Sequence, residues 1–445
     1  MRKSGIVLHL AYVDRKEEIK PFEFELIKLL QNCSVKVWQH LPINPPGKYD
    51  SPYSALSVFA GDLNILSCKI EVKYDEKEFQ QWFKENKEWA IDWALYTFLK
   101  KKHHNSEWFN WPEIYKFRDK SALEYIKRNE RECIDELIME QFIFDKKWAL
   151  IKEKSNQKGI SLFGDMPFYV ALDSADVWAN PQLFDLDRNL LPIKIGGVPP
   201  DYFSENGQVW ENPLYKWKNH RKNGFKWWQM RIKINKKRFD LLRIDHFRAL
   251  VSSWCIDYGS ETAINGYWRK GPGRELIDKI TEILPAEFLV AEDLGIITNA
   301  VKKLIKDYNL LGMRVLQFVY NSELPNEHHH DNIIQNTVCY IGTHDTNTAK
   351  GWFNQMKNSK NVNCFDHLLE EYNMNETNVS KQMINIAMKT KADICMMTIQ
   401  DLMNLGEEGR INVPGKNKGN WKLFLRQQDI LEIDWKFVRN VATNR

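Results

Sequence analysis

The sequence lacks the features of disulfide-rich and membrane-spanning proteins. Its seven cysteines form an odd set without a C-x-x-C pair, at positions 33, 68, 133, 255, 339, 364 and 395. Scattered, unpaired cysteines are typical of reduced thiols and predict a cytoplasmic protein without disulfides. The apolar run at the N-terminus is short and interrupted by Asp14, so the sequence predicts neither a signal peptide nor a transmembrane helix.

An excess of charge of one sign is also missing. The 63 basic and 59 acidic residues give a formal net charge of +4, so no strong electrostatic field is expected to attract nucleic acid or an anionic membrane. With 445 residues, of which 43% are hydrophobic and 27% charged, the chain has the composition of a globular protein with a large core. No heptad repeat stands out from which an oligomeric state could be predicted.

The composition is unusual in its high content of aromatic residues. The chain has 17 Trp, 16 Tyr and 23 Phe, which together make 13% of its residues. Flat apolar rings edged with hydrogen-bond donors are the surfaces on which sugar rings stack, and a core does not require so many of them. Large loops filled with aromatic side chains would explain the same composition equally well.

Eight short apolar segments that end in polar residues recur along the chain. Stretches with helical periodicity lie between several of them, at residues 21–32, 274–284 and 297–308, and Thr298 is a candidate N-cap for the last. Strands that alternate with helices predict a parallel sheet, and eight such units predict an α/β fold of the closed (β/α)8 TIM-barrel type. The eight predicted strands lie within residues 5–13, 34–43, 159–170, 239–247, 287–295, 311–320, 337–346 and 392–402.

Two connections are too long for a simple barrel and predict inserted subdomains. Residues 44–157, between the second and third strands, are charged and mainly helical in pattern. Residues 171–238, between the third and fourth strands, are rich in Pro, Gly, Trp and Tyr, as expected of loops that cover a cleft. We therefore expect residues 1–445 to form one catalytic barrel with two insertions and no separate C-terminal β domain.

Four carboxylates occupy the same relative position, just after the apolar part of four different predicted strands. In a TIM barrel these strand ends surround the functional cleft, so the four side chains are expected to point into one mouth. Each of them could instead cap a following helix, but four caps in equivalent positions are a weaker explanation. The four residues are Asp165, Asp245, Glu292 and Asp345.

Two carboxyl groups that face each other across a cleft are the minimum apparatus for cleaving a glycosidic bond. Glu292 is the candidate acid, because Asp293 beside it and the apolar residues before it would raise its pKa. Asp245 is the candidate nucleophile, because Arg243 lies two residues earlier on the same strand face and would keep it ionised.

A metal site is the alternative interpretation of these residues. The pairs Asp245–His246 and His344–Asp345 and the segment "EHHHD" (327–331) contain the right ligand types. Adjacent residues on a strand point to opposite faces, however, and the three histidines lack H-E-x-x-H spacing, so a surface loop is predicted for them. The glycines of "KIGGVPP" (194–200) and "GPGRE" (271–275) match no phosphate-binding motif and predict turns. No metal or cofactor is expected.

Seven motifs, in order from about residue 36 to 421, resemble those of the amylomaltases. These enzymes are 4-α-glucanotransferases, also called disproportionating enzymes, of the α-amylase-related barrel clan. The long match at residues 197–217 resembles this family specifically, whereas the three motifs around the carboxylates indicate only the wider clan. The motifs are "DSPY" (50–53), "DSADVWANPQLF" (173–184), "GVPPDYFSENGQVWENPLYKW" (197–217), "RIDHFR" (243–248), "AEDLG" (291–295), "GTHDT" (342–346) and "GRINVPG" (409–415).

The resemblance implies a role for each matching residue. Asp245 would be the nucleophile, Glu292 the general acid and base, and Asp345 the carboxylate that stabilises an oxocarbenium-like transition state. The partners would be α-1,4-glucans such as malto-oligosaccharides, starch or glycogen, together with glucose. The implied substrate-binding residues are Asp50, Ser51, Tyr53, Arg243, Asp293, His344 and Asn412 on the donor side, and Asp201, Tyr202, Phe203, Gln208 and Trp210 on a lid over the acceptor side.

Two functions other than that of a transferase are compatible with the same residues. An α-glucan hydrolase would use the same three carboxylates, and a glucan-binding protein would retain the fold with a decayed site. The chain departs from the family pattern mainly in loops, where "GKYDSPY" (47–53) stands in place of "GYGDSPY" and residues 11–24 replace a Gly-rich loop. The preferred donor and acceptor chain lengths are therefore not predicted.

Overall fold

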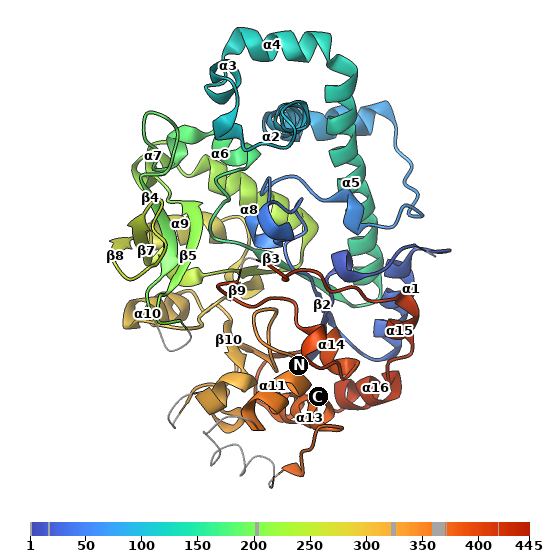
Figure 1. Cartoon of the computed structure of the whole chain (residues 1–445). Helices are drawn as coiled ribbons and strands as arrows, with labels where there is room; N and C mark the ends of the chain where they lie inside the picture. The colour runs from blue at the N-terminus through green and yellow to red at the C-terminus, as the bar shows by residue number, and fades with distance from the viewer. Residues whose placement is uncertain are drawn as a thin grey trace.

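Eight short parallel strands form a ring at the centre of the molecule (Figure 1). The structure is a computed structural model, and it describes residues 2–16, 18–200, 204–321, 326–357, 370, 372–416 and 418–445. A bridge between Val290 and Leu311 joins the first and last strands of the sheet and closes the barrel. The predicted (β/α)8 fold is confirmed. The barrel strands are β1 (Lys3–Val7), β2 (Val37–Gln39), β3 (Ser161–Met166), β6 (Leu241–Ile244), β9 (Leu289–Ala291), β10 (Gly312–Val315), β11 (Thr337–Tyr340) and β12 (Ile394–Thr398).

Side chains alternate between the inside of the barrel and the helices around it. Leu241 packs inward with Val37, Phe163 and Met396, whereas Leu242 and Ile244 pack outward into the larger core beneath the helices. Because apolar side chains fill the interior, polar groups on the strands reach solvent only near the strand ends.

The helical segments predicted from periodicity are present between the strands. They are α1 (Phe22–Asn32), α9 (Arg274–Thr281) and α10 (Asn299–Asp307). Thr298 occupies the N-cap position of α10, but its side chain makes no capping hydrogen bond. The later helices are α11 (Ala349–Lys357), α13 (Val379–Lys389), α14 (Ile399–Leu402), α15 (Gln427–Leu431) and α16 (Trp435–Thr443).

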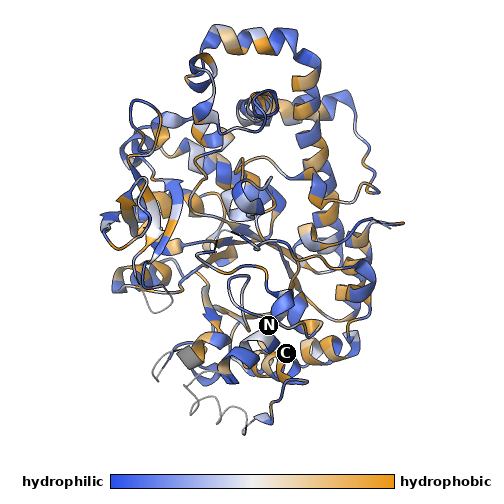
Figure 2. Cartoon of the chain, viewed as in Figure 1, coloured by the Kyte–Doolittle hydropathy of each residue, from blue (hydrophilic) through white to orange (hydrophobic). Residues whose placement is uncertain are grey.

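The long connection between β2 and β3 forms a group of helices beside the barrel (Figure 1). Asp75 and Glu78 form a capping box that begins α2, and α2 packs along α5. Figure 2 shows polar and apolar residues alternating along α4 and α5, as expected of helices with one buried side. The helices are α2 (Glu76–Lys102), α3 (Glu113–Lys116), α4 (Lys120–Asn129) and α5 (Arg131–Gln157).

A second, antiparallel sheet lies beside the barrel mouth, in the order β5-β4-β7-β8. Two of its strands, β4 (Lys194–Val198) and β5 (Gln208–Pro213), come from the connection between β3 and β6. The other two, β7 (Ser252–Asp257) and β8 (Tyr267–Lys270), come from the connection between β6 and β9, where the sequence predicted a helix but no strand. The connection between β3 and β6 also contains α6 (Ala175–Ala179), α7 (Trp217–Lys222) and α8 (Lys226–Arg238).

The two ends of the described chain lie side by side (Figure 1). Arg445 donates a hydrogen bond of 3.0 Å from Nε to the carbonyl oxygen of Lys3, the first residue of β1. Within the described residues, none of the helices combines the length and the apolar character needed to cross a bilayer.

Candidate active site

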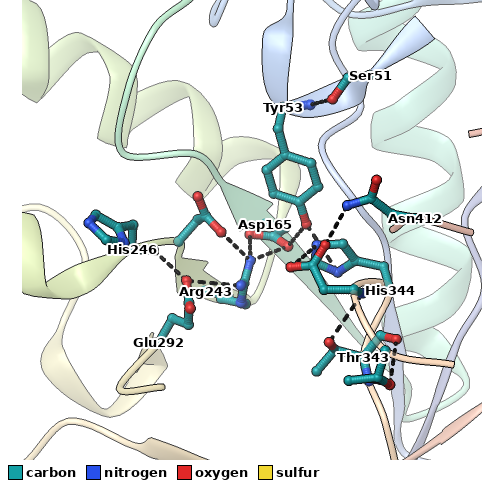
Figure 3. A network of polar contacts seen from close by, with 12 residues as sticks. Ser51, Tyr53, Asp165, Arg243, His246, Glu292, Thr343, His344 and Asn412 are labelled. Carbon is teal, nitrogen blue, oxygen red and sulfur yellow. Dashed lines mark hydrogen bonds and ion pairs between the residues drawn. The ribbon is translucent and has the colours of Figure 1, made fainter. Parts of the chain in front are cut away.

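The ends of the barrel strands bring three carboxylates to one arginine (Figure 3). Asp165 on β3 pairs in register with Arg243 on β6, and Asp245 follows two residues later on the same face. Glu292 comes directly after β9, the next strand in the ring. The alternation of strand residues therefore explains why these four side chains meet.

Arg243 is buried and binds all three carboxylates. Its Nη1 lies 2.7 Å from both oxygens of Asp165 and 3.0 Å from Oδ1 of Asp245. Its Nη2 lies 3.1 Å from Oε2 of Glu292. Asp245 and Glu292 are thus held by the two nitrogens of one guanidinium, while only about a quarter of the Asp245 side chain, and less of Glu292, stays accessible.

Tyr53 and His344 form one side of this arrangement. The Tyr53 hydroxyl donates a hydrogen bond of 2.7 Å to Oδ2 of Asp165, and its ring stacks on His344 with centroids 4.8 Å apart. Trp421 contacts both rings. A pocket opens beside these residues, and its lining includes Gln39, Asp165, Arg243, Tyr340, Thr343 and His344.

Asp345 is held separately from the Arg243 group. Its Oδ1 accepts a hydrogen bond of 2.6 Å from the amide of Asn412, and its Oδ2 lies 3.4 Å from Nε2 of His344. Arg410 supports this position, because it donates to the backbone oxygens of Asp345 and Asn412. Asp345 therefore approaches the site from the side of Tyr53 and His344, with nearly half of its side chain accessible.

His246 and Trp210 form the opposite side. The backbone N–H of His246 donates a hydrogen bond of 2.5 Å to Oε2 of Glu292, in a turn where His246 has a φ of +48°. The Trp210 ring packs edge-on against His246 at 4.7 Å, and its indole N–H donates to Gln208. Trp210, which binds Gln208, thus contacts the residue whose backbone binds Glu292.

Six other predicted site residues lie outside the Arg243 group or outside the described residues. Ser51 caps the short 3-10 turn that carries Tyr53, and Asp50 is exposed beside it. Asp293 is bound by the backbone N–H of Met313 at 2.6 Å and by Arg314 at 3.0 Å. The roles predicted for Asp50, Ser51 and Asp293 therefore stay predictions. The predicted lid residues Asp201, Tyr202 and Phe203 lie outside the described residues.

The electrostatics of the site differ from the expectation that Arg243 keeps Asp245 ionised. Burial raises the pKa of Asp245 well above its usual range, and the neighbouring carboxylates of Glu292, Asp165 and Asp345 raise it further, although Arg243 opposes them. Three carboxylates share the one positive charge of Arg243, so that charge only partly offsets the effects of burial and of the neighbouring carboxylates on Asp245. Burial lowers the pKa of His246 to about 3, so its imidazole is neutral.

Several residues of the site were not assigned a role from the sequence. Asp165 was noted at a strand end, and its register with Arg243 was the signal that would have placed it in the group. Trp421 and Arg410 come from the C-terminal segment, far from the carboxylates in sequence. His246 acts through its backbone N–H, which a pattern of side chains does not reveal.

The segment "EHHHD" contains histidines in different environments. His328 accepts a hydrogen bond from the backbone N–H of Val315, and burial lowers its pKa to about 4. His329, His330 and Asp331 have ligand atoms within 4.8 Å of one another, the one such group among the described residues. A surface loop was predicted for these histidines, and in the structure His329 caps the 3-10 turn His330–Asn332.

Comparisons with known proteins give a consistent result over nearly the whole chain. A family profile described as 4-alpha-glucanotransferase matches residues 66–428. The 4-alpha-glucanotransferase of Aquifex aeolicus is 35% identical to this chain, and the match covers 96% of each protein. The chloroplastic/amyloplastic 4-alpha-glucanotransferase of Solanum tuberosum is 34% identical, over 94% of this chain and 81% of that protein. Among solved structures, the amylomaltase from Streptococcus agalactiae in complex with acarbose superimposes with a TM-score of 0.90 at 29% identity, covering 100% of this chain and 99% of that one.

Proposed function

This chain belongs to the 4-alpha-glucanotransferase family, and we propose that Asp245, Glu292 and Asp345 carry out its reaction. The enzyme transfers a segment of α-1,4-glucan from a donor to the 4-hydroxyl of an acceptor glucan or glucose. The observation that supports the assignment most directly is that Arg243 holds Asp245 and Glu292 on its two nitrogens at the mouth of the barrel.

The first half of the reaction forms a covalent intermediate. Asp245 attacks the anomeric carbon while Glu292 gives its proton to the departing glycosidic oxygen, which leaves the donor segment esterified to Asp245. This step requires Asp245 to be ionised, and the positive charge of Arg243, which lowers the pKa of Asp245 against the effect of burial, favours that form. Asp345, held by Asn412 and not by Arg243, keeps a negative charge available for the oxocarbenium-like transition state.

The second half returns the segment to an acceptor. Glu292 removes the proton from the acceptor 4-hydroxyl, which attacks the anomeric carbon and releases Asp245. Transfer requires that a sugar reach the intermediate before water does. Trp210 and Gln208 next to His246 offer an aromatic face and an amide on the acceptor side, and we propose that Asp201, Tyr202 and Phe203 complete this lid.

Aromatic and polar side chains beside Asp165 are suited to bind the donor sugar. Tyr53, stacked on His344 and bonded to Asp165, is proposed to pack against the donor ring. Acarbose, which is bound in the amylomaltase from Streptococcus agalactiae, is proposed to bind here as well. A cytoplasmic location is supported by the six cysteines of the described residues, all of which are free thiols.

Incubation with maltotriose tests the reaction. Disproportionation yields glucose and longer oligosaccharides without a net rise in reducing ends, whereas a steady rise in reducing ends would establish a hydrolase instead. Asp245→Asn and Glu292→Gln should each reduce transfer by at least about 10²-fold. Asp185→Asn is the matched control, because Asp185 also pairs with an arginine, Arg269, but outside the Arg243 group.

A further inference from the structure

An exposed ion pair joins the two sides of the site. Nζ of Lys48 lies 2.7 Å from Oε2 of Glu211. Lys48 begins the 3-10 turn Lys48–Asp50, which leads into the turn that carries Tyr53. Glu211 lies on β5, directly after Trp210. The pair therefore connects the side with Tyr53 to the side with Trp210.

These two sides flank the carboxylates from opposite directions. Tyr53 is bonded to Asp165 and stacked on His344, whereas Trp210 packs against His246, whose N–H binds Glu292. In Figure 3, Tyr53 and His344 lie on one side of Arg243 and His246 and Glu292 on the other. A glucan with one sugar beside Tyr53 and the next beside Glu292 must run between the two segments that the ion pair joins.

The backbone on both sides of the pair is strained. Tyr49 and Asp50 have φ angles of +61° and +59°, and Glu211 has a φ of +60°. Residues other than glycine adopt this conformation only where their surroundings hold them in it, and such residues concentrate at functional segments. The two segments therefore present Lys48 and Glu211 to each other in a defined geometry.

We propose that the Lys48–Glu211 ion pair is a clasp that closes over the bound glucan and favours short chains over long ones. This inference rests on the proposed function. A short oligosaccharide enters under the clasp by its end, whereas an internal segment of a long chain enters only when the clasp is open.

The ion pair is weak, so it should slow the entry of long chains without preventing it. About half of each side chain is accessible, 48% for Lys48 and 58% for Glu211, and exposed ion pairs contribute little free energy. Partial burial lowers the pKa of Lys48, but the hydrogen bond and charge of Glu211 together with Tyr49 raise it above its ordinary value, so Lys48 stays charged at neutral pH. The clasp should therefore open often and weaken with salt.

Kinetics on a long and a short donor test the clasp. Lys48→Met and Glu211→Gln remove one charge each and keep the size of the side chain. Each should raise the ratio of kcat/KM for long-chain amylose to that for maltotriose by about two- to fivefold. The double variant Lys48→Glu/Glu211→Lys restores the attraction and should return the ratio to that of the wild type. Lys194→Met is the matched control, because Lys194 forms an exposed ion pair with Asp257 in the same sheet.

Salt provides a second measurement. Raising NaCl to about 1 M shortens the screening length to about 3 Å, so the ratio should rise in the wild type but stay constant in Lys48→Met. Single variants with an unchanged ratio, or a double variant that does not recover, would refute the clasp. If the wild type does not disproportionate maltotriose, the proposed function is wrong. The clasp is then tested by measuring the association rates of amylose and maltotriose through tryptophan fluorescence, which needs no turnover. Lys48→Met should raise the ratio of the amylose rate to the maltotriose rate.

Discussion

Replacing Asp165 by asparagine tests whether the carboxylates around Arg243 titrate together. Asp165→Asn keeps the size of the side chain and an oxygen that accepts hydrogen bonds, but removes one negative charge. Asp165 is one of the neighbours that raise the pKa of Asp245. We therefore expect the acid limb of the pH profile of kcat/KM, which reports ionisation of the nucleophile in the free enzyme, to move to lower pH.

The size of this shift follows from the geometry. Oδ2 of Asp165 and Oδ1 of Asp245 contact the same nitrogen of Arg243 at 2.7 and 3.0 Å, so they are at most about 5.7 Å apart. Two unit charges at this separation repel by about 3 kcal/mol at an effective dielectric constant of about 20, which corresponds to about two pKa units. Because the Asp245 side chain is 24% exposed, solvent screens part of this repulsion, and a shift of about one pH unit is expected.

Glucose release from maltotriose, measured between about pH 4 and 9, gives the profile. Asp185→Asn removes a carboxylate that pairs with Arg269 outside the group, and should leave the limb in place. If Asp165→Asn lowers kcat/KM equally at all pH values, Asp165 only positions Arg243 and the carboxylates do not titrate together.

Three further changes test other parts of the structure. Tyr53→Phe removes the hydroxyl bonded to Asp165 but keeps the ring on His344, so kcat/KM should fall by about tenfold, and Tyr53→Ala should lower it further. Burial raises the pKa of Asp176 to about 7, so the folded state binds more protons between about pH 4 and 7 and the free energy of unfolding falls as pH rises. The change in Tm caused by Asp176→Asn should therefore be more favourable at pH 8 than at pH 5. An equal change in Tm at both pH values would contradict this. Dialysis against EDTA should leave transfer unchanged, because the proposed chemistry uses only carboxylates and Arg243; a loss restored by a divalent cation would refute it.

The barrel could be predicted because its strands carry a local signal. Each predicted run overlaps a barrel strand, and in residues 239–247 the apolar residues of the strand alternate between two buried layers. The antiparallel sheet carries no such signal. β7 pairs with β8 and also with β4, which comes from a different connection. Pairing between remote segments cannot be predicted from either segment alone. Half-buried strands with residues such as Tyr267 and Arg269 also lack a clear apolar face.

The site could be predicted where neighbours along one strand share a face. Arg243 and Asp245 are two residues apart on β6, and their ion pair of 3.0 Å follows directly from strand alternation. Asp165 was expected at the same barrel mouth, but its contact with Arg243 was not predicted because it depends on the register between β3 and β6. Register is set by the packing of the whole barrel, so a single sequence does not reveal it.

The source of the catalytic proton shows why neighbours in sequence can mislead. Glu292 and Asp293 are adjacent, and the sequence analysis used the charge of Asp293 to explain an acid that stays protonated. In the structure Asp293 lies over Gly312, where a side chain would collide with its carboxylate, and its charge is matched by Arg314. The carboxylates that lie near Glu292 come from other strands and are brought there by Arg243. The charged surroundings of Glu292 therefore depend on the pairing of β3, β6 and β9, and not on the local sequence around Glu292.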